Sequence, residues 1–261
     1  MSELKRVCLI PNYSGVGGPA SFQLRFAAEA SRQGVEVCFN LDDRPYDAVL
    51  VIGGTRQLGK LQQAHRSGIP VVQRLDGFNW MHRVAQTSLP YRLRAEFRNL
   101  ILRVIRRRIA TRIVYQSEFV ARRWEQVFGP LDTPFNVIHN GVDLLEFTPE
   151  GPHERPSDRP RMMMLEGAFH GGYDFGLKLG LDLAAALNET HGQHVEVAIA
   201  GKIDPEVQAS WDAYARVPLT WLGVVERAEI PYLHRSAHLY FSGEIHPACP
   251  NACLLYTSDA A

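Results

Sequence analysis

The stretch that decides the fold is residues 5–34, KRVCLIPNYSGVGGPASFQLRFAAEASRQG. An apolar run ends in a polar loop rich in glycine, and a helical pattern then extends from Ser21 to Gln33, where Gly34 stops it. A strand that is apolar at every position is typical of a sheet covered by helices on both faces. The segment therefore predicts a strand, a loop and a helix of a parallel α/β sheet.

The same alternation continues toward the C-terminus. Strands are predicted at 35–39, 48–52, 69–73, 112–115 and 135–138, and helices at 58–66, 91–111 and 118–128. Alternation over residues 1–150 predicts one Rossmann-like domain built on a doubly wound parallel sheet. The polar, proline-rich stretch 151–160 is predicted to be an interdomain linker.

A second Rossmann-like α/β domain is predicted at 161–252. Its expected strands are 161–165, 195–200, 219–222 and 239–242, and its expected helices are 174–188, 205–215 and 227–235. A further helix should begin near Pro250, so we expect this second sheet to be incomplete and the chain to be a fragment. Residues 253–261 resemble a translated sequencing adapter and are predicted to be non-native, with a natural polar tail as the alternative.

Composition excludes several function classes. The chain has 28 Lys plus Arg and 28 Asp plus Glu, so charge gives no case for binding nucleic acid. It has no apolar run of about 18 residues that could span a bilayer and no signal peptide, so a cytoplasmic location is expected. No CxxC pair occurs and no histidines have the spacing of metal ligands, so no metal site is predicted.

Ligands of an open α/β sheet bind beyond the carboxyl ends of its strands. After the first strand, Gly17 and Gly18 precede a helix N-terminus whose free amides suit a phosphate, although the loop could be a plain tight turn. The loop has neither the GxGxxG nor the GxxxxGK[ST] pattern. Asp76 follows the predicted strand 69–73 and could act as a base, orient a sugar hydroxyl or cap the next turn.

The segment HNGVDLLEFTP at 139–149 resembles the interdomain segment of the family 4 glycosyltransferases, which have the GT-B fold. Further pieces occur in matching order: GGPASFQ at 17–23, VYQSEFVARRW at 114–124, AIAGK at 198–202, WLGVV at 221–225 and HRSAHLYFSGEIHPACPN at 234–251. The resemblance covers nearly all of residues 5–252.

The resemblance implies that the full-length parent transfers a sugar from a nucleotide-sugar donor to a glycan or lipid-linked acceptor, with retention of configuration and without a metal ion or other cofactor, whereas this truncated chain is predicted to be nearly inactive. The donor would bind mainly in the second domain and the acceptor mainly in the first. Taken together, the residues and the resemblance give these candidates: Asp76 and Glu244 for catalysis; Gly17, Gly18, Lys202, Pro250 and Asn251 for donor binding; and His139, Asn140, Gly141 and Asp143 for the cleft between the domains.

The sequence departs from the family pattern at the donor site. Leu255 stands where a glutamate should hold the donor ribose, and Glu166 stands near the position of an expected arginine. Lys202 is the candidate replacement for that cation, and Glu244 could equally be a solvated loop carboxylate. Two other functions stay open: a sugar- or acceptor-binding fragment without catalysis, and a sugar-nucleotide epimerase, which the HNGVD segment and the Gly-Gly-Pro loop disfavour.

The helix predicted at 91–112 is strongly basic and also carries many apolar residues. It could lie on anionic lipid and bring the protein to the inner face of a membrane. Alternatively, its arginines are simply solvated and its apolar stripe packs on the sheet.

Overall fold

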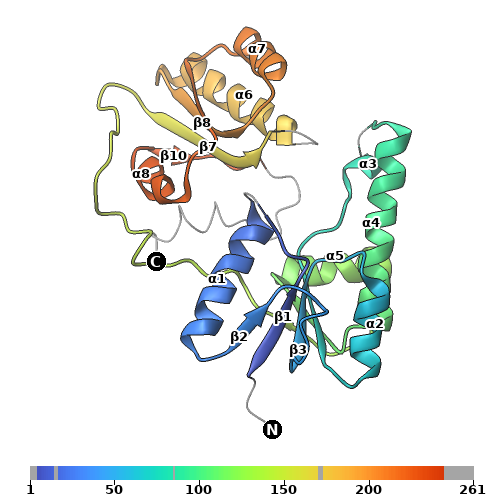
Figure 1. The fold of residues 1–261 in the computed structure, drawn as a ribbon. Helices are drawn as coiled ribbons and strands as arrows, with labels where there is room; N and C mark the ends of the chain where they lie inside the picture. The colour runs from blue at the N-terminus through green and yellow to red at the C-terminus, as the bar shows by residue number, and fades with distance from the viewer. Residues whose placement is uncertain (1–4, 15–16, 85, 170–172, 244–261) are drawn as a thin grey trace. The chain divides into compact units, whose positions relative to one another are not determined.

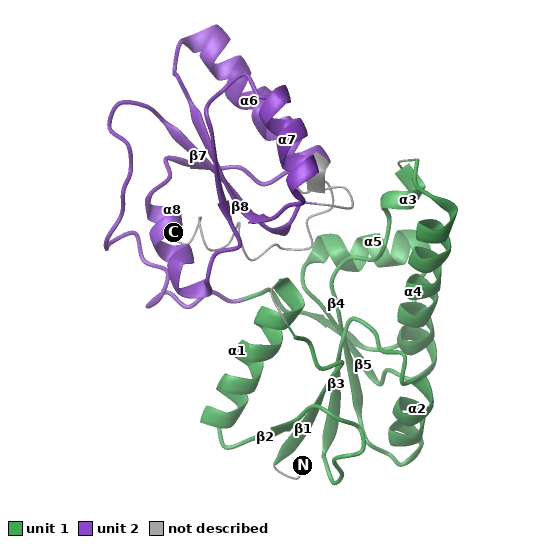
Figure 2. Ribbon diagram, turned by 45° about the horizontal axis from the view of Figure 1, so that its top comes forward, with its two compact units in different colours: residues 1–140 green, residues 141–261 purple. Residues whose placement is uncertain are grey.

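The structure of the protein is a computed structural model that describes residues 5–14, 17–84, 86–169 and 173–243. It divides into two compact units, residues 1–140 and 141–261 (Figure 2). The predicted linker 151–160 therefore lies within the second unit.

The first unit is a single sheet of six parallel strands in the order β2-β1-β3-β4-β5-β6. This order and the all-parallel pairing confirm the predicted doubly wound sheet. Its elements are β1 (Arg6–Ile10), α1 (Gly18–Arg32), β2 (Glu36–Cys38), β3 (Ala48–Ile52), α2 (Leu58–Arg66), β4 (Val71–Leu75), α3 (Met81–Val84), α4 (Leu89–Arg108), β5 (Arg112–Tyr115), α5 (Glu118–Phe128) and β6 (Phe135–Val137) (Figure 1).

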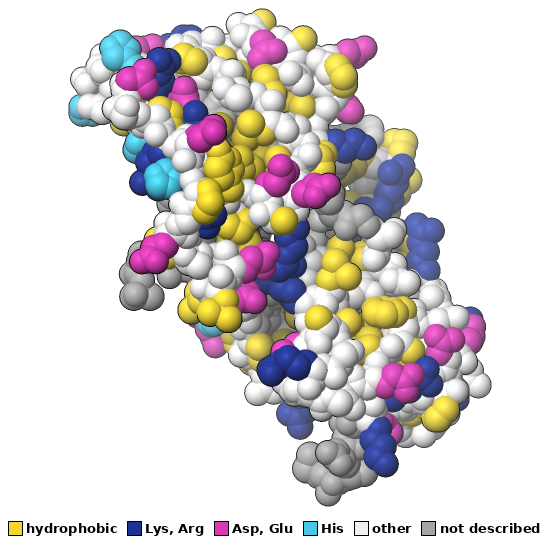
Figure 3. All heavy atoms as spheres, turned by 60° about the vertical axis from the view of Figure 1, so that its left-hand side comes forward, with side chains coloured by type: hydrophobic (Ala, Val, Ile, Leu, Met, Phe, Trp, Pro, Cys, Tyr) yellow, Lys and Arg dark blue, Asp and Glu magenta, His cyan; other side chains and the backbone are white. Residues whose placement is uncertain are grey.

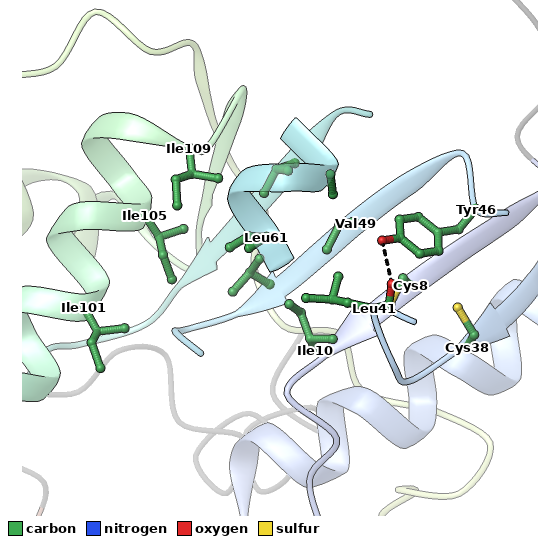
Figure 4. Packing of buried hydrophobic residues seen from close by; sticks show 13 residues of the cluster. Cys8, Ile10, Cys38, Leu41, Tyr46, Val49, Leu61, Ile101, Ile105 and Ile109 are labelled. Carbon is green, nitrogen blue, oxygen red and sulfur yellow. Dashed lines mark hydrogen bonds between the residues drawn. The ribbon is translucent and has the colours of Figure 1, made fainter. Parts of the chain in front are cut away.

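Helices cover both faces of this sheet. On one face, α2 and α4 place Leu61 and Ile105 against Ile10 and Val49, in the cluster drawn in Figure 4. On the other face, α1 packs Phe22 and other apolar side chains over the remaining residues of β1 and β3. Because the strands are buried on both sides, their sequences are continuously apolar.

The described residues of the second unit form four parallel strands in the order β10-β7-β8-β9. Its elements are β7 (Arg161–Ala168), α6 (Tyr173–His191), β8 (Glu196–Lys202), α7 (Pro205–Tyr214), β9 (Leu219–Gly223), the 3-10 helix η1 (Arg227–Glu229), α8 (Ile230–Arg235) and β10 (Leu239–Tyr240). The segment before β7 is held against α8, since Arg155 Nη2 donates to the Arg235 carbonyl at 2.7 Å and Arg235 Nε donates to the Pro152 carbonyl at 3.1 Å.

Three helix boundaries differ from the predictions where a proline lies in the first turn. The helix expected to begin at Ser21 begins at Gly18, with Pro19 as its second residue. The helix expected to begin at 91 begins at Leu89, since Pro90 fits the first turn, where its missing N–H is not needed. The helix expected at 227–235 is divided into η1 and α8, with Pro231 in the first turn of α8. The short helix α3 was not predicted.

The packing of α4 predicts unequal effects of two substitutions on one helix. Ile105 is fully buried against the sheet, whereas Leu100 is 50 % exposed. Ile105→Ala should lower the free energy of unfolding by about 2–5 kcal/mol, because it leaves a cavity in the core. Leu100→Ala should change it by less than about 0.5 kcal/mol. Urea unfolding followed by circular dichroism measures both, and equal losses would contradict the described packing.

Candidate functional site

In the first sheet, β1 and β3 are neighbours, but the connection after β1 leads to β2 on one side and the connection after β3 leads to β4 on the other. The order of the strands therefore reverses between β1 and β3, which is the topological switch point where open α/β sheets bind ligands. The loops that follow these two strands meet at the carboxyl edge of the sheet. Tyr13 joins them, because its hydroxyl donates to the Ile52 carbonyl at 3.1 Å. Its amide donates to Gln23 Oε1 at 2.8 Å, which also ties the first loop to α1.

A buried guanidinium lies at this edge. Arg74, in β4, is 5 % exposed, and its Cζ atom is 3.7 Å from the centre of the Phe22 ring of α1. Its Nη2 donates to Asn140 Oδ1 at 2.6 Å, and Asn140 Nδ2 donates to Gln116 Oε1 at 3.1 Å. The aromatic face and the amide stabilise a charge that would be costly to bury alone.

Asp76 follows the same strand and is half-buried. Burial raises the pKa of its carboxyl above the ordinary value, and the charge of Arg74 opposes the shift. The pKa of Tyr13 is also raised, first by burial and then by the charge of Asp76. A carboxyl whose pKa is raised, at the carboxyl edge of an open α/β sheet, has the chemistry to exchange a proton with a hydroxyl.

The glycine loop leads directly into α1. Gly17 is the N-cap, and its φ of 121° is a conformation that favours glycine. Gly18 is the first residue of the helix, and a Cβ atom there would meet nothing within 4 Å. No side chain among the described residues caps this helix. Pro19 has no N–H, so the amides of Gly18 and Ala20 are the ones at the helix start that could reach an acceptor group.

The predicted cleft residues fall on both sides of the unit boundary. Asn140 ends the first unit, whereas Gly141 and Asp143 belong to the second. Asp143 caps a turn, because its Oδ1 accepts from the Leu145 amide at 2.9 Å. His139 is exposed to solvent.

In the second unit the switch point lies between β7 and β10. Lys202 ends β8 and is exposed, and it makes no ion pair with any residue that the structure describes. Near the start of α6, a Cβ atom on Gly176 would lie 2.7 Å from the Gly243 carbonyl oxygen, so the two backbones are in contact. Glu244, Pro250 and Asn251, together with residues 253–261, lie outside the described residues.

The buried polar side chains of this edge were not predicted. Gln73 is fully buried, and its Nε2 donates to the Gly53 carbonyl at 2.8 Å and to the Leu102 carbonyl at 3.2 Å. Gln23, Arg74 and Gln116 are also buried. The sequence feature that could have indicated them is the polar pair Gln73-Arg74 inside the otherwise apolar strand β4.

Neither a metal site nor a membrane-spanning helix is present in the described part of the chain. No three His, Cys, Asp or Glu residues among the described residues lie together in a way that could hold a metal ion. No helix in the same residues combines the length and apolar character needed to cross a bilayer.

Comparison with solved structures identifies the architecture. Sucrose-phosphate synthase from Thermosynechococcus elongatus matches 90% of this chain and 74% of its own, with a TM-score of 0.67 and 11% identity. The chain has the GT-B fold. WaaG, a glycosyltransferase involved in lipopolysaccharide biosynthesis, matches the same shares with a TM-score of 0.63 and 12% identity. A glycosyltransferase from Rickettsia africae covers 94% of this chain and 74% of its own, with a TM-score of 0.59 and 13% identity.

No protein-family model and no curated protein sequence matches the chain. The structural likeness, at these identities, concerns the fold.

The raised pKa of Asp76 predicts a pH dependence of stability. In the unfolded chain the Asp76 carboxyl has its ordinary pKa, and in the folded protein its pKa is higher. Protonated Asp76 therefore makes its full contribution to the free energy of unfolding below the pKa of the unfolded state. This contribution is lost as the pH rises through the pKa of the folded state. Asp76→Asn should remove this slope and be at least as stable as the wild type at neutral pH. Urea unfolding from about pH 2.5 to 8 measures the difference, because the range must also include the region below the ordinary carboxyl pKa.

Asp47 provides the matched control. Its carboxylate accepts the amides of Arg6 and Lys5, and these bonds lower its pKa. The contribution of Asp47 to the free energy of unfolding is present above its pKa in the unfolded state and is lost as the pH falls through its pKa in the folded state. Asp47→Asn should therefore remove a pH dependence of stability whose sign is opposite to that of Asp76. Slopes of the same sign for the two variants would contradict the environment described for Asp76.

Proposed function

We propose that the protein transfers a sugar from a nucleotide-sugar donor to a hydroxyl of a glycan or lipid-linked acceptor. The observation that carries the proposal is the Asp76 carboxyl beside the buried Arg74, at the carboxyl edge of a GT-B sheet. In this position Asp76 would orient the acceptor hydroxyl or receive its proton. The names of WaaG and sucrose-phosphate synthase support sugar transfer as the general chemistry.

The finer parts of the proposal follow the family 4 resemblance. The donor would bind mainly to the second unit, with its diphosphate held by Lys202 and by the helix start predicted near Pro250 and Asn251, without a metal ion. Gly17 and Gly18 would face the phosphates, and Glu244 would be the acidic residue on the donor side. The anomeric configuration would be retained.

A lipid-linked acceptor implies action at a membrane surface on the cytoplasmic side. WaaG, which acts in lipopolysaccharide biosynthesis, supports this acceptor class by analogy of fold. The basic helix α4 is the element proposed for peripheral contact with the membrane.

The reaction is tested by incubating the chain with a panel of nucleotide sugars and with glycan or polyprenyl-phosphate-linked acceptors. A glycosylated product whose anomeric proton coupling, measured by NMR, matches that of the donor would support the proposal. Conversion of the donor sugar to its epimer without an acceptor would support an epimerase instead. Donor or acceptor binding without turnover at any concentration would support the binding fragment.

Asp76→Asn separates catalysis from donor binding. The variant should lower kcat by at least about 100-fold, because it removes the group that exchanges the acceptor proton. Its affinity for the nucleotide sugar, measured by calorimetry, should stay within about twofold, because the proposed donor contacts lie in the second unit. Asp47→Asn, a surface substitution on the same unit, should leave both values unchanged. An unchanged kcat in Asp76→Asn would remove Asp76 from the mechanism.

A further inference from the structure

The carbonyl of Asp76 lies just beyond the pairing of β4 with β5. The last register pair of these strands is Leu75 with Tyr115, and the Leu75 carbonyl accepts from the Gln116 amide at 3.2 Å. The next carbonyl, that of Asp76, accepts from the indole N–H of Trp124 at 2.9 Å. Trp124 therefore gives the Asp76 main chain a hydrogen bond of the kind that neighbouring strands give within β4.

Trp124 belongs to a buried aromatic group. It is fully buried in α5, and Phe78 and Phe128 are each 8 % exposed. The ring of Phe78 lies edge-on to the other two, with its centre 5.6 Å from that of Trp124 and 5.0 Å from that of Phe128. Edge-to-face contacts favour one arrangement of the rings. The packing therefore fixes the indole, and it also anchors the chain at Phe78, two residues after Asp76.

A second anchor follows at Asn79. Asn99, in α4, is buried, and its Oδ1 accepts from the Asn79 amide at 2.9 Å and from Asn79 Nδ2 at 3.1 Å. Its Nδ2 donates to the Asn79 carbonyl at 2.8 Å. Figure 2 shows α4 and α5 beside the end of β4. Segment 76–79 is therefore attached at both ends, to α5 through Trp124 and to α4 through Asn99.

Gly77, between the two anchors, has no packing of its own. A Cβ atom at this position would meet nothing within 4 Å. Glycine also has the widest choice of backbone conformations, so Gly77 does not restrict its neighbours. The conformation of Asp76 therefore depends on the anchors on either side of Gly77.

Charge at long range does not determine the state of the Asp76 carboxyl. The chain has a formal net charge of zero, and acidic and basic side chains are interspersed on the face shown in Figure 3. Fields from such mixed exposed charges largely cancel, and salt screens the remainder beyond about 10 Å. The titratable groups that interact with Asp76 are local: Arg74 on the same strand and Tyr13 after β1. The titration of Asp76 therefore reports where its carboxyl lies.

We propose that Trp124 and Asn99 are positioning residues, which hold Asp76 so that its carboxyl can face an acceptor hydroxyl at the edge of the first sheet. The inference rests on the proposed function, because it assigns a task to the surroundings of Asp76. Neither residue has to touch a substrate. Trp124 acts through the Asp76 carbonyl, and Asn99 acts through Asn79. A reacting group that is held in one geometry loses less rate to unproductive orientations.

The alternative is that Trp124 only fills the core of the first unit. Its loss would then lower the free energy of unfolding and leave the Asp76 carboxyl as it is. Two residues provide controls. Trp221 makes an indole hydrogen bond elsewhere, to Asp212 Oδ1 at 2.7 Å in the second unit. Ile105 is fully buried in the first unit but packs in the cluster with Ile10.

The test is an NMR titration of the whole chain, isotope-labelled at the aspartate carboxyl carbons, with Asp76→Asn to assign the signal. Trp124→Phe removes the indole N–H and frees the carboxyl to regain water. We expect the titration midpoint of Asp76 to move toward the ordinary carboxyl value by at least about 0.5 pH unit. Asn99→Leu should move it in the same direction. Trp221→Phe and Ile105→Ala should leave it within about 0.2 pH unit of the wild type.

A size-matched replacement keeps the test decisive if Trp124→Phe does not fold, as judged by circular dichroism. Benzothienylalanine incorporated at position 124 keeps the shape of the indole but lacks its N–H, and it should shift the Asp76 midpoint in the same way. The proposal is overturned if the folded variant at position 124 leaves the midpoint unchanged. It is also overturned if Ile105→Ala shifts the midpoint as much, because the shift would then follow from lost core packing.

Turnover separates this inference from the proposed function. If the chain transfers sugar, Trp124→Phe should lower kcat at least about tenfold and change the KM for the donor less than about twofold. A kcat that falls in Asp76→Asn but not in Trp124→Phe would overturn the positioning role and leave the proposed function intact. A midpoint that shifts in a chain without transfer activity would support the positioning of Asp76 and count against the proposed function.

Discussion

Helices cover both faces of the first sheet, and this constraint determines where polar chemistry can occur. Side chains along β1 and β3 point into apolar layers on either side, so an ionised group there would lose its hydration without compensation. At the carboxyl edge the layers end and loops supply polar partners. Arg74 can be buried at this edge because Phe22 and Asn140 receive its guanidinium. The loop after β1 and the start of the HNGVD segment are assembled around the same group of side chains.

Strand positions were predictable because the strands are apolar without interruption and are bounded by glycine, proline or polar residues. Ala48–Ile52, Arg112–Tyr115 and the helix Glu118–Phe128 were predicted with their observed ends. Ser117 caps the last of these, because its hydroxyl accepts the Val120 amide, and a serine before a helical pattern is a local signal that can be recognised in a sequence. The doubly wound parallel sheet was predictable from the alternation of strands and helices.

Tertiary placement was harder to predict. Asp76 was found because it follows a strand, but nothing local to Arg74 shows that Phe22 and Asn140, from distant segments, surround it. The orientation of α4 was undecided for a related reason. Two sets of residues repeat at helical spacing: Ile101, Ile105 and Ile109, which are buried, and Leu93, Phe97 and Leu100, which are exposed. Only the packed structure shows which set faces the sheet. The donor-side candidates after Gly243 lie outside the described residues, so they stay predictions.

The contact between Gly176 and Gly243 has a consequence for how the protein can vary. The first turn of α6 and the residue that precedes the predicted donor-side segment touch through bare backbone, with no space for a methyl group on either side. Any side chain would push the helix start and the loop apart, and the loop carries the chain toward Glu244. A compensating change elsewhere cannot restore the contact, because both partners are main chain. Across a complete library of single-codon variants, these two positions should tolerate only synonymous change.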